Sequence, residues 1–299
     1  MLEIRRSPSR TRPRVPRYTA ALVAVAAVGL LLVLGARSHA STPPTARSAA
    51  ELDALARSWA PGAERAVHGR SSLARAAALT ETRMPYVAVG GRRRRDVALT
   101  FDDGPGPYTA ALVRVLNRLR VPATFFQIGT MVWAFPATER LMARDRRFAF
   151  GDHTESHPPL GRLTAALQWE QIVAGAQAPG AEGVRGLRLF RPPYGSFDAT
   201  TLEIAHHLHL LPVLWTIDSE DYTRPGVAPI VDRVLGDARP GAIVLMHDAG
   251  GDRSETIAAL PAIVRGLRRR GFRLVTVPRM LLDDPPPERQ PPASGNGAG

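Results

Sequence analysis

Two motifs in the sequence combine residue types that bind a metal ion and move protons. Asp102 and Asp103 are adjacent carboxylates at the end of the apolar run 97–101. Adjacent residues leaving a strand point in different directions, so the two acids can take different roles. His153 and His157 stand four positions apart, the spacing that places both imidazoles on one face of a helical turn. Two imidazole nitrogens and one carboxylate oxygen hold an ion such as zinc and leave a position open for water.

Three further motifs could complete such a site. Arg191 precedes two prolines that stiffen its loop, and because its guanidinium keeps its charge it can orient a carboxylate. An acidic motif covers Asp218–Tyr222. His247 follows the apolar run 242–245 and is a candidate general acid. Each of the five motifs directly follows an apolar, strand-like run in the sequence.

The order and spacing of these motifs resemble the signature of the NodB-homology polysaccharide deacetylases, carbohydrate esterase family four. The resemblance covers roughly residues 94–278. It implies an α/β fold, a distorted (β/α) barrel with about seven parallel strands. It also implies an enzyme that hydrolyses the acetyl amide of N-acetylglucosamine units in a cell-wall or chitin-like polysaccharide, peptidoglycan being favoured. One divalent ion is expected, and zinc suits two histidines and one aspartate, while cobalt or nickel accept the same ligands.

The resemblance assigns the metal ligands and the proton-transfer groups. The ion would be held by three side chains: Asp103, His153 and His157. Asp102 would be the general base for the attacking water, and Arg191 would keep the Asp102 carboxylate ionised and oriented. His247 would protonate the leaving amine, and Asp221 would be the carboxylate that raises the pKa of His247.

Three aromatic residues are expected at the substrate. By resemblance, the backbone N–H of Tyr194 would help to hold the oxyanion. Trp215 precedes the acidic motif and can line a sugar groove, and Tyr222 stands where the family usually has Trp. Asp152 and Glu155 replace a common Asn and a common aromatic residue. Because these departures touch pocket walls and not the ligands, the reaction is expected to be kept while the substrate preference stays open.

The N-terminus has the composition of an export segment. A basic cytoplasmic stretch, residues 1–18, precedes the apolar run 19–36, an order that places the N-terminus inside the cell. An uncleaved signal anchor and a cleaved signal peptide both fit this pattern. The first predicts a membrane-held extracellular domain and the second a secreted one. A buried core helix fits poorly because the run has no polar face.

The rest of the chain divides by composition. We expect a spacer at 37–85, the catalytic domain at 86–280, and a disordered Pro- and Gly-rich tail at 281–299. Helices are expected at 108–119 and at 198–208, where Asp198 can be the N-cap. The strand-like runs are 97–101, 123–128, 147–150, 187–190, 212–217, 242–246 and 272–277. Helices between strands imply a parallel sheet. In a barrel of parallel strands the active site lies at the carboxyl ends of the strands, so we expect the site there.

Composition argues against a nucleic-acid partner, disulfide bonds and a second metal site. The formal net charge is +12, but much of the excess lies in the export segment and the chain has no lysine, so no nucleic-acid partner is expected. Because the chain has no cysteine, the exported domain depends on its core and not on disulfides. We expect a monomer. A second metal site at His206, His207 and His209 is not expected, since no carboxylate is spaced to complete it.

Two rival functions share these motifs. An esterase acting on O-acetyl groups of xylan-like chains would use the same tetrahedral chemistry. A catalytically idle wall-binding module would keep the fold, but such a module would be expected to lose a ligand or the base. Neither loss occurs at Asp102, Asp103, His153 or His157.

Overall fold

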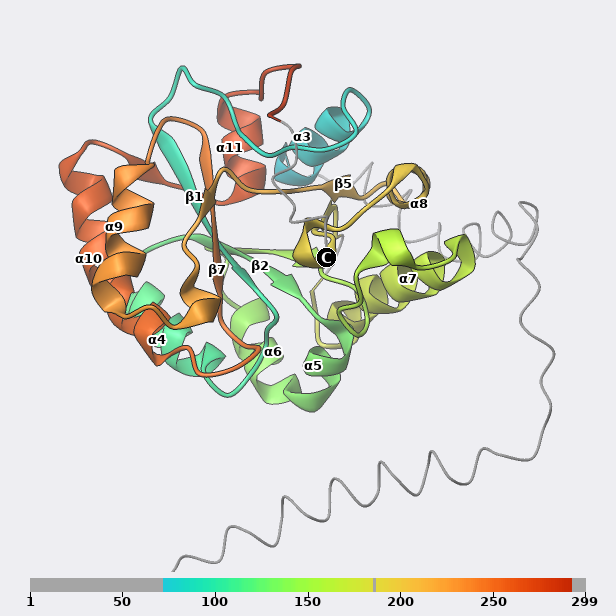
Figure 1. The fold of residues 1–299 in the computed structure, drawn as a ribbon, viewed down its shortest axis with the longest axis horizontal. Coiled ribbons are helices and arrows are strands. Elements are labelled where there is room, and N and C mark those ends of the chain that lie inside the picture. The colour runs from blue at the N-terminus through green and yellow to red at the C-terminus, as the bar shows by residue number, and fades with distance from the viewer. Residues whose placement is uncertain (1–71, 185–186, 292–299) are drawn as a thin grey trace, which may run out of the picture. The chain divides into compact units, whose positions relative to one another are not determined.

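One parallel sheet organises the part of the chain that the computed structural model describes, residues 72–184 and 187–291 (Figure 1). Within these residues eight strands pair, in the order β5-β4-β3-β2-β1-β7-β6, with β8 beside the start of β1. The strands are β1 (Asp96–Asp102), β2 (Ala123–Gln127), β3 (Phe148–Asp152), β4 (Leu189–Phe190), β5 (Leu211–Pro212), β6 (Ile217–Asp218), β7 (Ala242–His247) and β8 (Arg273–Leu274). The predicted α/β fold with about seven parallel strands is confirmed, whereas the pairing of the described strands ends at β5 and β6 and does not close the barrel.

Helices cover the sheet. They are α3 (Ser72–Glu81), α4 (Thr109–Leu119), α5 (Gly129–Ala134), α6 (Pro136–Ala143), α7 (Ala165–Ala181), α8 (Ala199–His207), α9 (Val227–Gly236), α10 (Ser254–Arg269) and α11 (Val277–Asp283). Figure 1 shows α4, α9 and α10 along one side and α7 and α8 along the other. The predicted N-cap Asp198 accepts a hydrogen bond from the backbone N–H of Thr201, so the start of α8 is as expected.

Strand β1 shows how the sheet positions polar groups. Val97, Leu99 and Phe101 belong to the core that also includes residues of α4 and α10. Ala98 belongs to a second, inner core. Since side chains alternate along a strand, Asp102 shares the inner face with Ala98, at the carboxyl end of β1.

The predicted single strand 212–217 is wrong, because this run forms two strands. β5 pairs with β4, whereas β6 pairs with β7. Between them, the N–H of Val213 donates to Phe190 and the N–H of Thr216 donates to Ile243. The run therefore changes partners as it crosses the open side of the barrel. The run is apolar except for Thr216, so its composition did not indicate that its two ends would pair with different strands.

Two segments outside the predicted domain pack against it. Residues 72–85 were expected to be spacer, yet α3 lies against α11, with Ala76 and Ala77 buried. Part of the tail predicted to be disordered is also ordered: Oε1 of Gln290 accepts hydrogen bonds from the N–H groups of Ala88 and Val89, at 2.8 and 3.0 Å. Small side chains in α3 and one amide in the tail make these contacts, and neither stands out in the composition.

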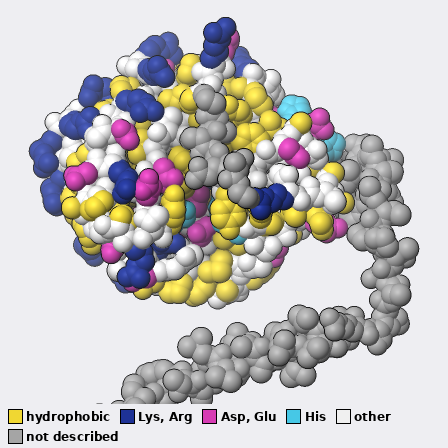
Figure 2. All heavy atoms as spheres, in the orientation of Figure 1, with side chains coloured by type: hydrophobic (Ala, Val, Ile, Leu, Met, Phe, Trp, Pro, Cys, Tyr) yellow, Lys and Arg dark blue, Asp and Glu magenta, His cyan; other side chains and the backbone are white. Residues whose placement is uncertain are grey.

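Arginines dominate the exposed charge. Figure 2 shows Lys and Arg side chains, all arginine in this chain, gathered over the side that carries α9 and α10. The clusters Arg92–Arg95 and Arg268–Arg270 are both exposed. No helix in residues 72–184 and 187–291 is long and apolar enough to cross a membrane. The predicted export segment, residues 1–36, lies outside these ranges.

Candidate active site

The five motifs converge at the carboxyl ends of the strands, as expected. Asp102 ends β1, and His247 ends β7 directly beside it, with the two Cα atoms paired in register. A cavity of about 810 Å³ opens there. Arg191 and Asp221 lie behind the cavity lining, and the other predicted site residues line it: Asp102, Asp103, His153, His157, Tyr194, Trp215, Tyr222 and His247.

Asp103, His153 and His157 form a group that can hold a metal ion. Their ligand atoms all lie within 4.8 Å of one another, and no second such group occurs in residues 72–184 and 187–291. Oδ1 of Asp103 lies 3.7 Å from Nε2 of His153 and 3.3 Å from Nε2 of His157. This oxygen is buried and has no hydrogen-bond partner among the described residues. A buried acceptor without a donor is costly, and a divalent cation would satisfy it, so these residues fit the expected ion.

The histidine motif is a bent loop and not the helical turn that the spacing predicted. Thr154 and His157 have positive φ, 68° and 63°. Oδ1 of Asp152 accepts a hydrogen bond from the N–H of Thr154, and Oγ1 of Thr154 accepts one from the N–H of His157. Pro158 follows and disfavours a helical conformation at His157. Local hydrogen bonds, and not helical periodicity, bring the two rings together.

His153 is held in the form that a metal ligand needs. Its Nδ1–H donates to the carbonyl oxygen of Arg191 at 2.6 Å, which leaves the Nε2 lone pair facing Asp103. Burial, followed by the charge of His157, lowers the pKa of His153 to about 3. The imidazole is therefore neutral at physiological pH.

Arg191 anchors Asp102 from behind. Its Nη1 donates to Oδ1 of Asp102 at 2.7 Å, and its Nε donates to the carbonyl of Val213 at 2.9 Å. The guanidinium is fully buried and lies over the ring of Phe126 at 4.0 Å. Burial raises the pKa of Asp102, and the charge and hydrogen bond of Arg191 oppose that rise. Arg191 thus holds the carboxylate in place and favours its ionised form.

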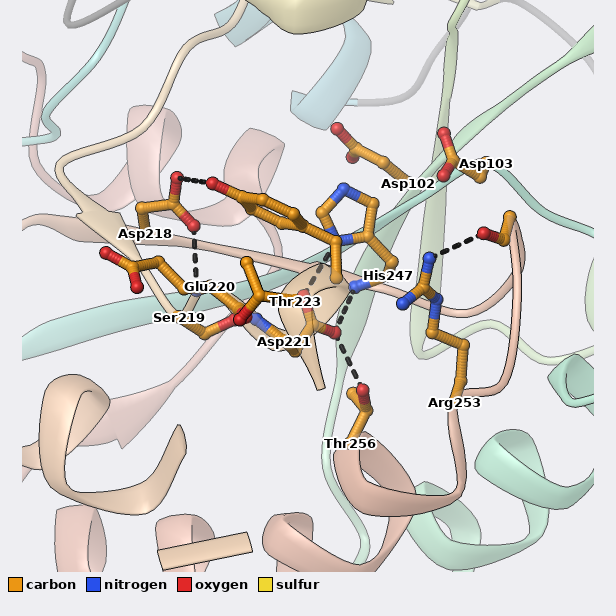
Figure 3. Close-up of polar contacts among 12 residues, drawn as sticks. Asp102, Asp103, Asp218, Ser219, Glu220, Asp221, Thr223, His247, Arg253 and Thr256 are labelled. Atoms are coloured by element: carbon orange, nitrogen blue, oxygen red, sulfur yellow. Dashed lines mark hydrogen bonds and ion pairs between the residues drawn. The ribbon is translucent and has the colours of Figure 1, made fainter. Parts of the chain in front are cut away.

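His247 pairs with Asp221 (Figure 3). Oδ1 of Asp221 lies 2.7 Å from Nδ1 of His247, and its Oδ2 accepts from the N–H of His247 and the hydroxyl of Thr256. Burial alone would lower the pKa of His247. The hydrogen bond and charge of Asp221, together with the charges of Asp103 and Asp102, outweigh burial and raise the pKa to about 9. At neutral pH His247 is therefore protonated.

Two exposed tyrosines flank the opening. Tyr194 is 60% exposed and its ring lies 4.5 Å from that of His157. Tyr222 is 46% exposed and its ring lies 5.5 Å from that of His247. The hydroxyl of Tyr222 donates to Asp218 at 3.4 Å. Both tyrosine rings therefore line the cavity, one beside His157 and the other beside His247.

Two buried charged residues at the site were not predicted to have a role there. Arg253 lines the cavity from the N-terminus of α10. Asp248 is fully buried behind Asp102, whose carbonyl accepts from the N–H of Asp248 at 3.1 Å, and burial raises the pKa of Asp248 to about 7. Asp248 directly follows His247, and this adjacency could have indicated that it belongs to the site. Arg253 lies six positions after His247, beyond Gly250 and Gly251, and had no such signal.

Known proteins are similar to this chain in sequence and in fold. The family model for polysaccharide deacetylases matches residues 90–213. A chitooligosaccharide deacetylase of Bradyrhizobium sp. (strain ANU 289) is 38% identical over 215 residues, which cover 68% of this chain and 97% of that protein. The solved structure of the Bc1960 peptidoglycan N-acetylglucosamine deacetylase has a TM-score of 0.64 at 30% identity, covering 67% of this chain and 94% of that one. A carbohydrate esterase family 4 pseudoenzyme from Bacillus anthracis has a TM-score of 0.61 at 27% identity, covering 68% and 69%.

These similarities coincide with the site. The family model spans Asp102, Asp103, His153, His157 and Arg191. The similarity to the Bradyrhizobium protein covers nearly the whole of that protein. The chain therefore belongs to the polysaccharide deacetylase family.

Proposed function

We propose that this enzyme removes the acetyl group from N-acetylglucosamine units of peptidoglycan, using one divalent ion, with zinc favoured. The observation that carries the proposal is the buried, unpartnered Oδ1 of Asp103 beside two imidazole nitrogens. An ion held there by Asp103, His153 and His157 would polarise the acetyl carbonyl and make a water molecule more acidic. We assign the other steps to side chains and one backbone N–H of the chain itself.

Asp102 is proposed as the base. It takes a proton from the attacking water as the new carbon–oxygen bond forms, and the Arg191 contact at 2.7 Å keeps the carboxylate aimed. The backbone N–H of Tyr194 is the proposed additional donor to the oxyanion. His247 then gives its proton to the amide nitrogen as the carbon–nitrogen bond breaks, which releases acetate and a free amine. Its raised pKa supports this role because the group starts protonated.

The substrate is proposed from three observations. The relatives include a chitooligosaccharide deacetylase and a peptidoglycan N-acetylglucosamine deacetylase. The exposed faces of Tyr194 and Tyr222 suit sugar rings. The export pattern of residues 1–36 favours a wall polymer outside the cell, met by a membrane-held or secreted monomer.

An idle wall-binding module is the rival of another class, and the pseudoenzyme neighbour shows that the fold alone does not ensure activity. Against this rival, both acids, both histidines and the His247–Asp221 pair are present in this chain.

Acetate release by the purified full chain, loaded with zinc, tests the proposal. The substrates are peptidoglycan, chitotetraose and acetylated xylan, and the matched control is Asp102→Asn. Release from peptidoglycan that is lost in the control supports the proposal. Release from xylan alone would favour the O-acetyl esterase, and no release from any substrate would favour the idle module.

A further inference from the structure

Arg253 is a buried cation on the wall of the cavity. It comes from the N-terminus of α10, and its residue is 4% exposed. Figure 3 shows it on the opposite side of His247 from Asp218. The roles proposed above for the site residues make no use of it. A guanidinium cannot lose its charge, so burial at this position calls for a compensating group.

The described residues satisfy Arg253 only in part. Its Nε donates to the carbonyl of Ala249 at 2.6 Å, and its Nη2 donates to the carbonyl of Gly250 at 2.8 Å. Within residues 72–184 and 187–291, Nη1 has no acceptor and no carboxylate lies within the 4.0 Å limit of an ion pair. The two carbonyl contacts are neutral. They explain how the guanidinium is held but not what balances its charge.

The carboxylates around the cavity are engaged elsewhere. Asp218 accepts hydrogen bonds from the N–H of Glu220 and the hydroxyl of Tyr222, on the opposite side of His247 from Arg253 (Figure 3). Asp102 pairs with Arg191, Asp221 with His247, and Glu220 with Arg233. The Glu220–Arg233 distance is 2.6 Å. Asp103 faces the two metal-binding histidines, so a bound divalent ion would take its charge. None of these carboxylates is left over to neutralise Arg253.

A glycine keeps the space beside Arg253 open. A Cβ added at Gly250 would lie 2.3 Å from Oδ2 of Asp103 and 3.4 Å from Nη2 of Arg253. Gly250 therefore lies between the guanidinium and Asp103, a residue of the expected ion site, and places no side chain there. A group bound at Arg253 would sit close to the acetyl group under attack.

We infer that Arg253 forms an anion subsite that binds a carboxylate carried by the sugar chain next to the reacting acetyl group. The lactyl carboxylate of a muramic acid residue has the required charge and can accept from a guanidinium. The inference rests on the proposed function and narrows its substrate to glycans that bear a carboxylate.

Two matched oligosaccharides test this subsite in the full, zinc-loaded chain. Both alternate N-acetylglucosamine and N-acetylmuramic acid; one has free lactyl carboxylates and the other has them as neutral methylamides. The measured quantity is the ratio of kcat/KM for acetate release from the two. Dissociation constants from calorimetry give the same ratio without turnover. The variants are Arg253→Gln, Arg253→Lys and, as a control for net charge, the exposed Arg269→Gln.

The carboxylate form should be preferred by about tenfold in the wild type, the effect of one charge-assisted hydrogen bond. The preference should vanish in Arg253→Gln, persist in part in Arg253→Lys and stay unchanged in Arg269→Gln. Because both substrates meet the same variant, a general loss from a distorted loop cancels in the ratio.

Equal ratios in the wild type and in Arg253→Gln would overturn the inference and leave Arg253 as a clamp on the 249–250 loop. Acetate release from chitotetraose tests the proposed function by itself. If every substrate were inert, the function would fail, and the calorimetric ratio would still decide the subsite.

Discussion

The hydrogen bond between Asp221 and His247 should set the alkaline limit of activity, and Asp221→Asn tests this. With a pKa of about 9, His247 is protonated in most molecules at pH 8. Without the Asp221 carboxylate, its hydrogen bond and charge no longer raise the pKa of His247, so burial should bring that pKa back toward its ordinary value of 6.5. A general acid must start protonated, so the rate falls as pH rises through its pKa.

The size of the effect follows from these values. At pH 8 a group with a pKa of about 9 is roughly nine-tenths protonated, and one with a pKa of 6.5 is roughly 3% protonated. The kcat/KM of the variant should therefore be about thirtyfold lower than that of the wild type at pH 8, from the protonation of His247 alone. At pH 6 the same loss should be less than about twofold. A loss of orientation of the His247 ring would lower kcat/KM equally at pH 6 and at pH 8. It would therefore cancel in the ratio of the two values.

The assay is kcat/KM for acetate release between pH 5.5 and 9.5, at one zinc loading, for the wild type and Asp221→Asn. The exposed Asp237→Asn serves as the charge control and should leave the alkaline limb in place. A loss in Asp221→Asn of equal size at pH 6 and pH 8 would refute the reasoning. Asp221 would then orient His247 without setting its protonation.

Three other outcomes are expected. Chelation should abolish acetate release and added zinc or cobalt should restore it, whereas full turnover in a metal-free sample would contradict the proposed ligand set of Asp103, His153 and His157. Asp102→Asn should keep metal binding, measured by calorimetry, but lower kcat by on the order of a hundredfold, because it removes a proton acceptor and not a ligand. A joint loss of both would make Asp102 a ligand. Gly104→Ala should lower the free energy of unfolding, measured in urea, by about 1–3 kcal/mol, since its Cβ would lie 2.1 Å from Oδ2 of the buried Asp248; unchanged stability would mean that the loop shifts without cost.

The sequence alone determined which strand ends carry chemistry. Each motif directly follows an apolar run, and the carboxyl ends of parallel strands meet at one edge, so Asp102 and His247 could be assigned to one site from the sequence. The structure then showed that their strands are direct neighbours. The N-cap Asp198 was equally readable, because its hydrogen bond reaches only to Thr201. These features depend on a few consecutive residues or on a general rule of sheet topology.

Tertiary structure decided what depends on packing between distant segments. The run 212–217 changes partners between β4 and β7, and the position of α3 depends on α11, about two hundred residues away. The charge state of His247 follows from burial and from Asp221, and Arg253 reaches the cavity only because α10 starts beside the Asp103 loop. Burial and pairing energies arise from the whole arrangement of neighbours, so local sequence patterns identify the reacting groups while the packed fold sets their charge and surroundings.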